Sequence, residues 1–246
     1  MSPYTLIKLS ATASTNTYLK DLSRVTKLND ATVVVTSHQS KGRGQLGATW
    51  FSEDKKSLAF SIYKLFEGVE VKDSFYVSMA VAIGIAEILK EFNISGIKVK
   101  WPNDIMSRGK KCGGILIENF IQKSVVKTSI IGIGLNVNNE FFPGLPHASS
   151  MKLSSGQHYT ISEILDKIIC RVLKKLALVE SGLYQKIHTQ YHELLFMKEK
   201  IQVFEDLSKN RFNGVVKGVT SDGLLQVLLE SENIQTFDLK EVKFCL

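Results

Sequence analysis

Cationic, acidic, amide and aromatic side chains occur together in one short stretch of the sequence. The run Lys100-Trp101-Pro102-Asn103-Asp104 is followed closely by Lys111, two glycines and an apolar segment that ends at Glu118. Pro102 lacks a backbone donor and biases Trp101 away from the helical region, so the run predicts a turn with polar side chains available to a ligand. A cation for phosphate, a ring for stacking and a carboxylate for a metal ion or ribose suit a nucleotide.

A glycine-rich loop contains a second set of candidate residues. It reads Gln39-Ser40-Lys41-Gly42-Arg43-Gly44-Gln45-Leu46-Gly47-Ala48-Thr49-Trp50. Glycines let backbone amides approach an anion closely, and Arg43 adds a planar, charged donor group. The loop is neither a Rossmann fingerprint, since strand-like residues follow it, nor a Walker loop, since no Gly-Lys-Ser/Thr closes it. Taken alone, it is also compatible with a flexible surface loop.

Two further motifs are ambiguous when each is taken alone. Ser14-Thr15-Asn16-Thr17 lies at a predicted helix start, where short polar side chains cap the helix or bind a ligand. The motif Gly132-Ile133-Gly134-Leu135-Asn136-Val137-Asn138 ends an apolar strand, where glycines permit close approach by a ligand or by neighbouring backbone. Asn136 is suited to an adenine or ribose edge, although a bulged core strand is the simpler interpretation of this motif.

The hydrophobic pattern predicts strands mixed with helices, followed by a β-rich segment. We expect strands at residues 4–9, 31–37, 57–63, 110–119 and 125–138. We expect helices at residues 14–25, 73–92 and 160–180, the second amphipathic and the third opened by a capping box of Thr160 and Glu163. From Lys200 onward, short strand-like runs with turns at Asn213-Gly214 and Asp222-Gly223 predict a compact β-barrel.

In their order along the chain, these motifs resemble those of biotin protein ligases, and the resemblance covers about residues 4–195. It implies an α+β fold, with a mixed β-sheet flanked by helices and a small C-terminal SH3-like β-barrel. The expected domains are a catalytic ligase domain at residues 1–197 and the barrel at residues 198–246.

The resemblance also implies a two-step reaction with ATP and biotin as substrates and Mg²⁺ as the metal ion. The biotin carboxylate attacks the α-phosphate of ATP, which gives biotinyl-adenylate and pyrophosphate. A lysine of a biotin carboxyl carrier protein domain then attacks the mixed anhydride and forms an amide. The expected partner is therefore this carrier domain, and we expect a monomer or a homodimer.

Residue roles follow from the resemblance, motif by motif. The catalytic residues would be Lys111, Arg43 and Asp104, with Asp104 either a Mg²⁺ ligand or the group that orients the incoming amine. Nucleotide contacts would come from Trp50, Lys100, Asn103 and Asn136. Biotin contacts would come from Ser14, Thr15, Asn16, Gln39, Arg43, Gly44, Gln45, Lys111 and Gly114.

The loop departs from the family pattern in one respect. The family often has further arginines after the second glycine, whereas this chain has Gln45, Leu46 and Ala48 there. Arg43 is therefore the only arginine in the loop, so the loop offers fewer charge-assisted bonds to the adenylate phosphate, which bears on how tightly the adenylate is held.

Two other functions compete with biotin ligation. A lipoate or octanoyl ligase or transferase shares the fold, but biotin needs polar contacts to its ureido ring, which Ser14, Thr15, Asn16 and Gln39 can give. A non-enzymatic biotin-binding module would need neither Lys111 nor the run from Lys100. Because Ser14 lies within twenty residues of the start, we expect a ligase without an N-terminal DNA-binding domain.

Composition limits the setting of the protein. The 246 residues are 44% hydrophobic and 22% charged, with a formal net charge of +7 from dispersed lysines. No window approaches about 18 continuous apolar residues, so no membrane span is expected. The three cysteines, Cys112, Cys170 and Cys245, fit neither a disulfide framework nor a zinc pattern, which favours the cytoplasm. In a strand Cys112 points away from Lys111, so it is expected to be a small core residue.

Overall fold

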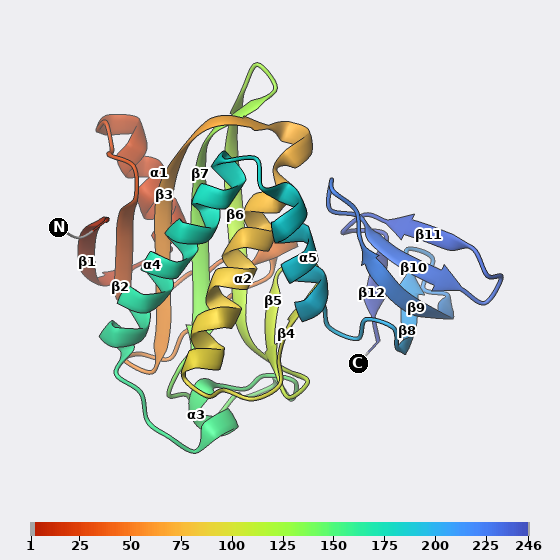
Figure 1. The fold of residues 1–246 in the computed structure, drawn as a ribbon. Helices are drawn as coiled ribbons and strands as arrows, with labels where there is room; N and C mark the ends of the chain where they lie inside the picture. The colour runs from red at the N-terminus through yellow and green to blue at the C-terminus, as the bar shows by residue number, and fades with distance from the viewer. Residues whose placement is uncertain (1–2, 246) are drawn as a thin grey trace.

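The computed structural model describes residues 3–245, and its main element is a seven-stranded mixed sheet (Figure 1). The strand order is β1-β2-β3-β7-β6-β5-β4. β1 and β2 run parallel, and the other neighbours run antiparallel. The strands are β1 (Thr5–Thr12), β2 (Thr32–Gln39), β3 (Ser57–Glu70), β4 (Ile97–Lys100), β5 (Asp104–Ser107), β6 (Lys110–Gln122) and β7 (Val125–Asn136).

Helices cover both faces of this sheet, which confirms the predicted α+β fold. Alternate residues of a strand point to opposite faces. Val33 and Ile131 therefore join the main core, while Val34 and Ile130 pack with Leu19 of α1 on the other face. The main core lies under α2, α4 and α5 (Figure 1). The helices are α1 (Thr15–Val25), α2 (Phe75–Glu91), α3 (Met151–Ser155), α4 (Ile161–Glu180) and α5 (Tyr184–Leu194).

The helix predicted at residues 73–92 is present as α2, but the expectation that it is amphipathic was wrong. Of its 17 residues, 12 are buried, and they occur on all sides of the helix. A helix that is apolar all round is one enclosed by its neighbours. Here α4 approaches so closely that a Cβ at Gly84 would lie 3.0 Å from Cγ2 of Val172.

The helix predicted at residues 160–180 is also present, as α4, although its capping box is not formed. Thr160 occupies the N-cap position, but its side chain makes no capping hydrogen bond. Tertiary packing of an apolar face stabilises most protein helices. That face is the predicted one, with Leu165, Ile168, Val172, Leu176 and Val179 all buried.

The five predicted strands are present, although each ends at a residue other than the predicted one. β3 continues to Glu70, well beyond the predicted end at residue 63. β4 and β5 were not predicted, because each has only four residues and shows too little alternation to detect. They form a hairpin around Trp101-Pro102-Asn103, which confirms the predicted turn.

The C-terminal segment forms a second, antiparallel sheet in the order β11-β10-β9-β8-β12. The closed barrel expected there is wrong, since β11 and β12 are unpaired edges in the part of the chain that the structure describes. Both edge strands are short, and β12 has only three residues. The strands are β8 (Ile201–Asp206), β9 (Arg211–Val219), β10 (Leu225–Leu229), β11 (Ile234–Phe237) and β12 (Val242–Phe244).

The second sheet is attached to the rest of the molecule through its β9–β10 turn and the end of β9. Nε1 of Trp101 donates a buried hydrogen bond of 2.8 Å to the carbonyl oxygen of Gly223. Nε2 of His188 in α5 lies 2.9 Å from the carbonyl oxygen of Val219. The Val219 amide donates to Nε2 of His192 at 3.0 Å. The two histidines of α5 therefore join that helix to the second sheet.

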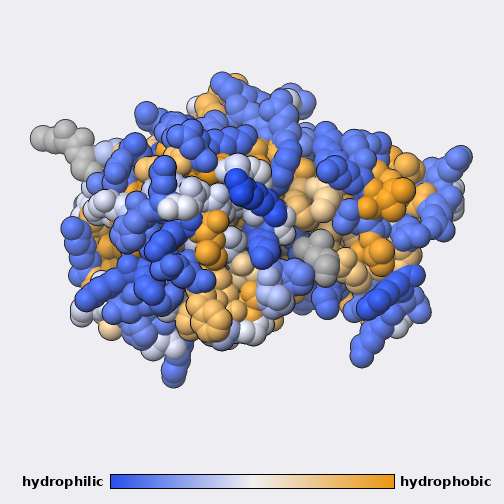
Figure 2. Space-filling model, turned by 90° about the horizontal axis from the view of Figure 1, so that it is seen from below, coloured by the Kyte–Doolittle hydropathy of each residue, from blue (hydrophilic) through white to orange (hydrophobic). Residues whose placement is uncertain are grey.

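The surface is mostly hydrophilic in the view from below, with hydrophobic side chains in separate small areas (Figure 2). The exposed hydrophobic residues of the second sheet and its turns include Ile201, Leu207 and Ile234. Among the described residues, no helix combines the length and apolar character that crossing a membrane requires.

Acidification is expected to weaken the junction at His192. Burial and the neighbouring His188 lower the pKa of His192 below its ordinary value of 6.5. The hydrogen bond with the Val219 backbone raises this pKa, but by less. The unfolded chain then binds this proton more tightly than the folded protein. The stabilisation is present above the ordinary pKa and decreases as the pH falls below 6.5. Denaturant unfolding at about pH 7.5 and about pH 5.5 should show this loss, and His192→Gln should reduce it. An equal loss in the variant would contradict the assignment.

Candidate active site

Small residues on three neighbouring strands form a flat floor on the face of the large sheet that carries α1. Ala59 and Ser61 of β3 pair with Gly134 and Gly132 of β7, and Gly114 of β6 pairs with Gly134. Paired residues of neighbouring strands point to the same face. A cavity of about 200 Å³ lies over this floor, where large side chains would otherwise stand.

The two glycines of β7 leave room for side chains from elsewhere in the chain. A Cβ at Gly132 would lie 2.3 Å from Oδ1 of Asn16, and a Cβ at Gly134 would lie 2.4 Å from Cε2 of Trp50. Neither distance is possible between real atoms, so the glycines are required for Asn16 and Trp50 to lie on the floor. The sequence predicted that a ligand or backbone would approach these glycines closely. In the structure, the side chains of Asn16 and Trp50 do so.

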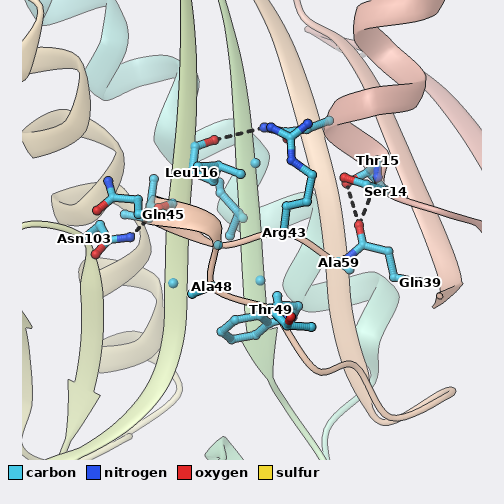
Figure 3. A pocket seen from close by; sticks show the side chains of 18 of the residues that line it. Ser14, Thr15, Gln39, Arg43, Gln45, Ala48, Thr49, Ala59, Asn103 and Leu116 are labelled. Atoms are coloured by element: carbon cyan, nitrogen blue, oxygen red, sulfur yellow. Dashed lines mark hydrogen bonds between the residues drawn. The ribbon is translucent and has the colours of Figure 1, made fainter. Parts of the chain in front are cut away.

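Polar groups at one end of the cavity bind one another (Figure 3). The backbone amide of Thr15 donates to Oε1 of Gln39 at 2.9 Å. The buried hydroxyl of Ser61 lies 2.7 Å from Oγ1 of Thr15 and 2.6 Å from Oδ1 of Asn16. Ser14 stands at the N-cap of α1 but makes no side-chain capping bond, and it lines the cavity instead. This end of the cavity is thus a preorganised polar pocket.

The glycine-rich loop folds over the cavity, and its arginine is held by an acidic residue of β6. The Gly44 amide donates to the Ala48 carbonyl at 2.7 Å, and the Trp50 amide donates to the Gly42 carbonyl at 2.9 Å. Nη2 of Arg43 lies 2.8 Å from Oε1 of Glu118. The loop predicted from its glycines is therefore ordered by its own backbone bonds and by this ion pair.

Glu118 connects the loop to the polar pocket. Its Oε2 accepts a hydrogen bond of 2.9 Å from Nδ2 of Asn16, and Nζ of Lys20 lies 3.6 Å from its Oε1. Burial raises the pKa of Glu118, but the bonds from Arg43 and Asn16 outweigh it, so the pKa lies below its ordinary value. The carboxylate therefore stays charged and holds both partners at once.

Lys111 stands at the other end of the cavity beside Asp104. Its Nζ lies 2.5 Å from Oδ1 of Asp104 and 5.8 Å from the centroid of the Trp50 ring. Its amide donates to the His147 carbonyl at 2.7 Å, and its carbonyl accepts from the Ser149 amide at 2.8 Å. Hydrogen bonds therefore hold the backbone of Lys111 in place, and its side chain lies next to a carboxylate and an aromatic ring.

A bulge gives Lys111 this orientation. Lys111 and Gly114 are three residues apart, so a regular strand would place them on opposite faces. The register between β5 and β6 shifts between Ile105 and Met106, and Lys111 and Gly114 both line the cavity. Cys112 points into the main core, as predicted, and burial raises the pKa of its thiol to about 12.

A second, more apolar cavity of about 380 Å³ adjoins the first. Thr49, Trp50 and Lys111 line both cavities. The indole Nε1 of Trp50 is buried and has no hydrogen-bond partner within residues 3–245. The rest of the second lining is Phe51, Asn136, Phe142, Gly144, Leu145, Pro146, His147 and Ala148.

Most of the predicted site residues meet around the first cavity, and two do not. Asn136 lines only the second cavity, where its Nδ2 donates to the Ser149 carbonyl at 2.9 Å. Lys100 lies toward the second sheet, with Nζ 5.3 Å from the centroid of the Phe244 ring, and burial lowers its pKa. The residues brought together are Ser14, Thr15, Asn16, Gln39, Arg43, Gly44, Gln45, Trp50, Asn103, Asp104, Lys111 and Gly114.

Ser61 and Glu118 belong to the site but were not among the predicted site residues. Ser61 is in a predicted buried strand, where a lone serine is a weak signal, and Glu118 only ends a quoted motif. Both residues act through pairing between distant strands. The sole sequence clue is that each occupies a polar position in an otherwise apolar run.

Few groups that could hold a metal ion lie together. No group of three or more histidine, cysteine, aspartate or glutamate side chains suited to a metal occurs in the described part of the chain. Asp104 is the acidic residue of the first cavity, and it pairs with Lys111. Magnesium is commonly bound by one or two carboxylates plus substrate phosphates. The donor set thus fits a magnesium ion that arrives with phosphates.

Comparisons with known proteins agree on one group of relatives. The model of the Biotin/lipoate A/B protein ligase family matches residues 9–136, which include every predicted site residue. The Bifunctional ligase/repressor BirA of Salmonella typhimurium is 34% identical over 125 residues, 50% of this chain and 38% of that protein. The Biotin--[acetyl-CoA-carboxylase] ligase of Mycobacterium tuberculosis is 30% identical over 125 residues, 50% of this chain and 45% of that protein. The chain thus matches less than half the length of either relative.

A solved structure shows the same fold over nearly the whole chain. The biotin protein ligase from Aquifex aeolicus, in complex with biotin and ATP, superposes with a TM-score of 0.81. The two chains are 24% identical, and the match covers 98% of each. At this identity the likeness concerns the fold, including the second sheet.

Gly134→Ala should displace the Trp50 indole, because the added Cβ would overlap it. Overpacking of this kind costs about 1–3 kcal/mol of stability. The chain has two tryptophans, so a ¹H–¹⁵N spectrum should show the Trp50 indole signal moving. The Trp101 signal, from an indole bonded to Gly223, should stay in place.

Gly114→Ala is the matched control on the same indole. Its added Cβ would lie 3.3 Å from Cζ3 of Trp50, a distance that a small shift relieves. A larger effect from Gly114→Ala than from Gly134→Ala would show that the indole does not lie on the floor as described.

Glu118→Gln should loosen the loop at Arg43, since it removes the ion pair. A pair with an exposed arginine is worth on the order of 1 kcal/mol, about fivefold in the population of the open loop. Trypsin should then cut after Arg43 about fivefold faster, which mass spectrometry of the fragments would measure. Glu140→Gln, which breaks the remote pair with Lys152, is the control. Equal cleavage in all three proteins would contradict the role of Glu118.

Proposed function

Because the chain belongs to the Biotin/lipoate A/B protein ligase family, we propose that it is an ATP-dependent biotin ligase. It activates biotin as biotinyl-5′-AMP and transfers the biotin to a lysine of a biotin carboxyl carrier protein domain. The proposal divides the chain into a catalytic domain at residues 1–197 and a C-terminal domain at residues 198–246. Three free cysteines agree with a cytoplasmic setting.

One observation carries this proposal: Lys111 lines both cavities. Biotin in the first cavity would place its ureido ring in the polar pocket of Thr15, Asn16 and Gln39, with its carboxylate toward Lys111. The adenine of ATP in the second cavity would lie against Trp50, whose unpaired indole N–H offers a donor. The carboxylate and the α-phosphate would then meet beside one lysine.

The first step needs cations, because it joins two anions. At about 4 Å, one pair of opposite unit charges is worth about 4 kcal/mol at an effective dielectric constant of about 20. Lys111 supplies one such charge, and Arg43 supplies another once an anion replaces Glu118 as its partner. The carboxylate oxygen forms a bond to the α-phosphorus, and pyrophosphate leaves.

We propose that magnesium is bound together with ATP. It offsets phosphate charge when it is bound. Among the residues of the first cavity, Asp104 would hold it. The alternative role of Asp104, to orient the incoming amine or accept its proton, remains part of the proposal.

In the second step the acceptor amine forms a bond to the acyl carbon of the adenylate. The bond from that carbon to the phosphate oxygen breaks, AMP leaves, and the amine loses a proton. A lipoate or octanoyl ligase or transferase would likewise transfer an acyl group to the amine of a carrier. It is not favoured, because the relative from Mycobacterium tuberculosis is named a biotin ligase and the Aquifex aeolicus structure is that of a biotin protein ligase. DNA binding is not proposed, since the positive charge is dispersed along the chain.

Lys111→Ala should slow adenylate formation at least tenfold, equivalent to about 1.4 kcal/mol of activation free energy. The reason is that this lysine is the cation shared by the two cavities. Biotin-dependent exchange of pyrophosphate into ATP measures the step without any carrier. Lys110→Ala is the matched control, since Lys110 is the exposed neighbour of Lys111. Normal exchange in Lys111→Ala would refute the assignment.

A further inference from the structure

A small polar cavity of about 190 Å³ adjoins the first cavity on the side of the second sheet. Gln45, Asn103 and Ile115 line both, so the two spaces are neighbours across these residues. The remaining polar lining comes from the start of α2, from β6 and from the second sheet, as Ser74, Ser78, Asn119 and Asp222. We call this space the side cavity.

The second sheet contributes Asp222 to the side cavity through a turn that is firmly held. The turn is held by the Trp101 bond to Gly223, and a Cβ at Gly223 would lie 2.5 Å from Cδ2 of Phe75. Oγ1 of Thr220 donates to Oδ1 of Asp222 and accepts from the Leu224 amide at 2.9 Å. The carboxylate is therefore placed at the side cavity by its own turn and by the contacts of that turn with the large domain.

The charges of the side cavity favour a cation. Its lining contains one carboxylate, Asp222, and no lysine or arginine. Asp222 is exposed and makes no ion pair with any residue in the range 3–245. The amino end of α2 adds a partial positive charge of about half a unit, which is smaller than the charge of the carboxylate. Pyrophosphate or another polyanion is therefore a poor occupant.

We propose that the side cavity is the passage by which the acceptor lysine of the carrier reaches the adenylate, and that Asp222 attracts its ammonium group. This inference rests on the proposed ligase function. A lysine fits because its ammonium group meets the exposed Asp222 on entry. Its side chain then extends past Gln45 and Asn103 into the first cavity. The ammonium group first loses one proton to solvent and becomes the amine. The amine attacks the acyl carbon, AMP leaves, and the nitrogen releases its second proton.

The test separates the two steps of the reaction in Asp222→Asn and Asp222→Lys. Pyrophosphate exchange should equal that of the wild type, because Asp222 does not line the first cavity. The kcat/KM for a purified biotin carboxyl carrier domain should fall at least fivefold in Asp222→Asn and further in Asp222→Lys. Asp222→Glu should recover most of the rate. Glu232→Gln, which changes an exposed carboxylate in the turn between β10 and β11, should have no effect.

Small acceptors show whether the lysine side chain itself is attracted. Release of biotin from preformed enzyme-bound adenylate by n-butylamine, a cation like lysine, should slow in Asp222→Asn. Release by neutral hydroxylamine should not change. Loss of carrier transfer with unchanged butylamine rates would place Asp222 at the carrier surface and overturn the passage. Equal transfer rates in all variants would overturn it as well. Absence of pyrophosphate exchange in the wild type would refute the ligase function itself, a different outcome.

Discussion

The site depends on a steric constraint: the floor of the large sheet must carry almost no side-chain volume. Gly132 and Gly134 leave the space that Asn16 and Trp50 occupy. Ala59 and Ser61, on the neighbouring strand, keep the floor low enough for a cavity. A methyl group added at Gly132 would displace Asn16 from the polar pocket, and one added at Gly134 would displace the Trp50 ring. We call this ring, which lines both cavities, the Trp50 partition.

Three segments that are far apart in the sequence converge on this floor. The start of α1 brings polar groups, the glycine-rich loop brings Arg43 and Trp50, and the bulged start of β6 brings Lys111. Glu118 links the first two, because it binds Asn16 and Arg43 with its two oxygens. A ligand anion that takes Arg43 from Glu118 would therefore change the loop and the polar pocket together, which gives the loop a physical reason to respond to ligands. The second sheet is held beside the site by the hydrogen bond from Trp101 to Gly223.

The motifs in the sequence were sufficient to predict which residue types surround the cavity, because each motif has a local signature. Lys111, Arg43 and Gln39 could be identified in this way. Ser61 and Glu118 could not, since their roles come from pairing of β3, β6 and β7, which a single sequence does not display. The bulge that turns Lys111 toward Gly114 was equally hidden, because it depends on the register of β5. The closed barrel was wrong for a related reason: short strands were predicted correctly, but closure depends on pairing between edges.

The central claim is that a carboxylate and a nucleotide meet at Lys111, across the Trp50 partition, and that the carboxylate belongs to biotin. The most direct measurement is native mass spectrometry of the protein after incubation with ATP, Mg²⁺ and either biotin or lipoate. We expect a protein-bound mass of biotinyl-adenylate with biotin and none of the corresponding adenylate with lipoate. A lipoyl-adenylate in place of the biotinyl species, or no adenylate with either acid, would contradict it.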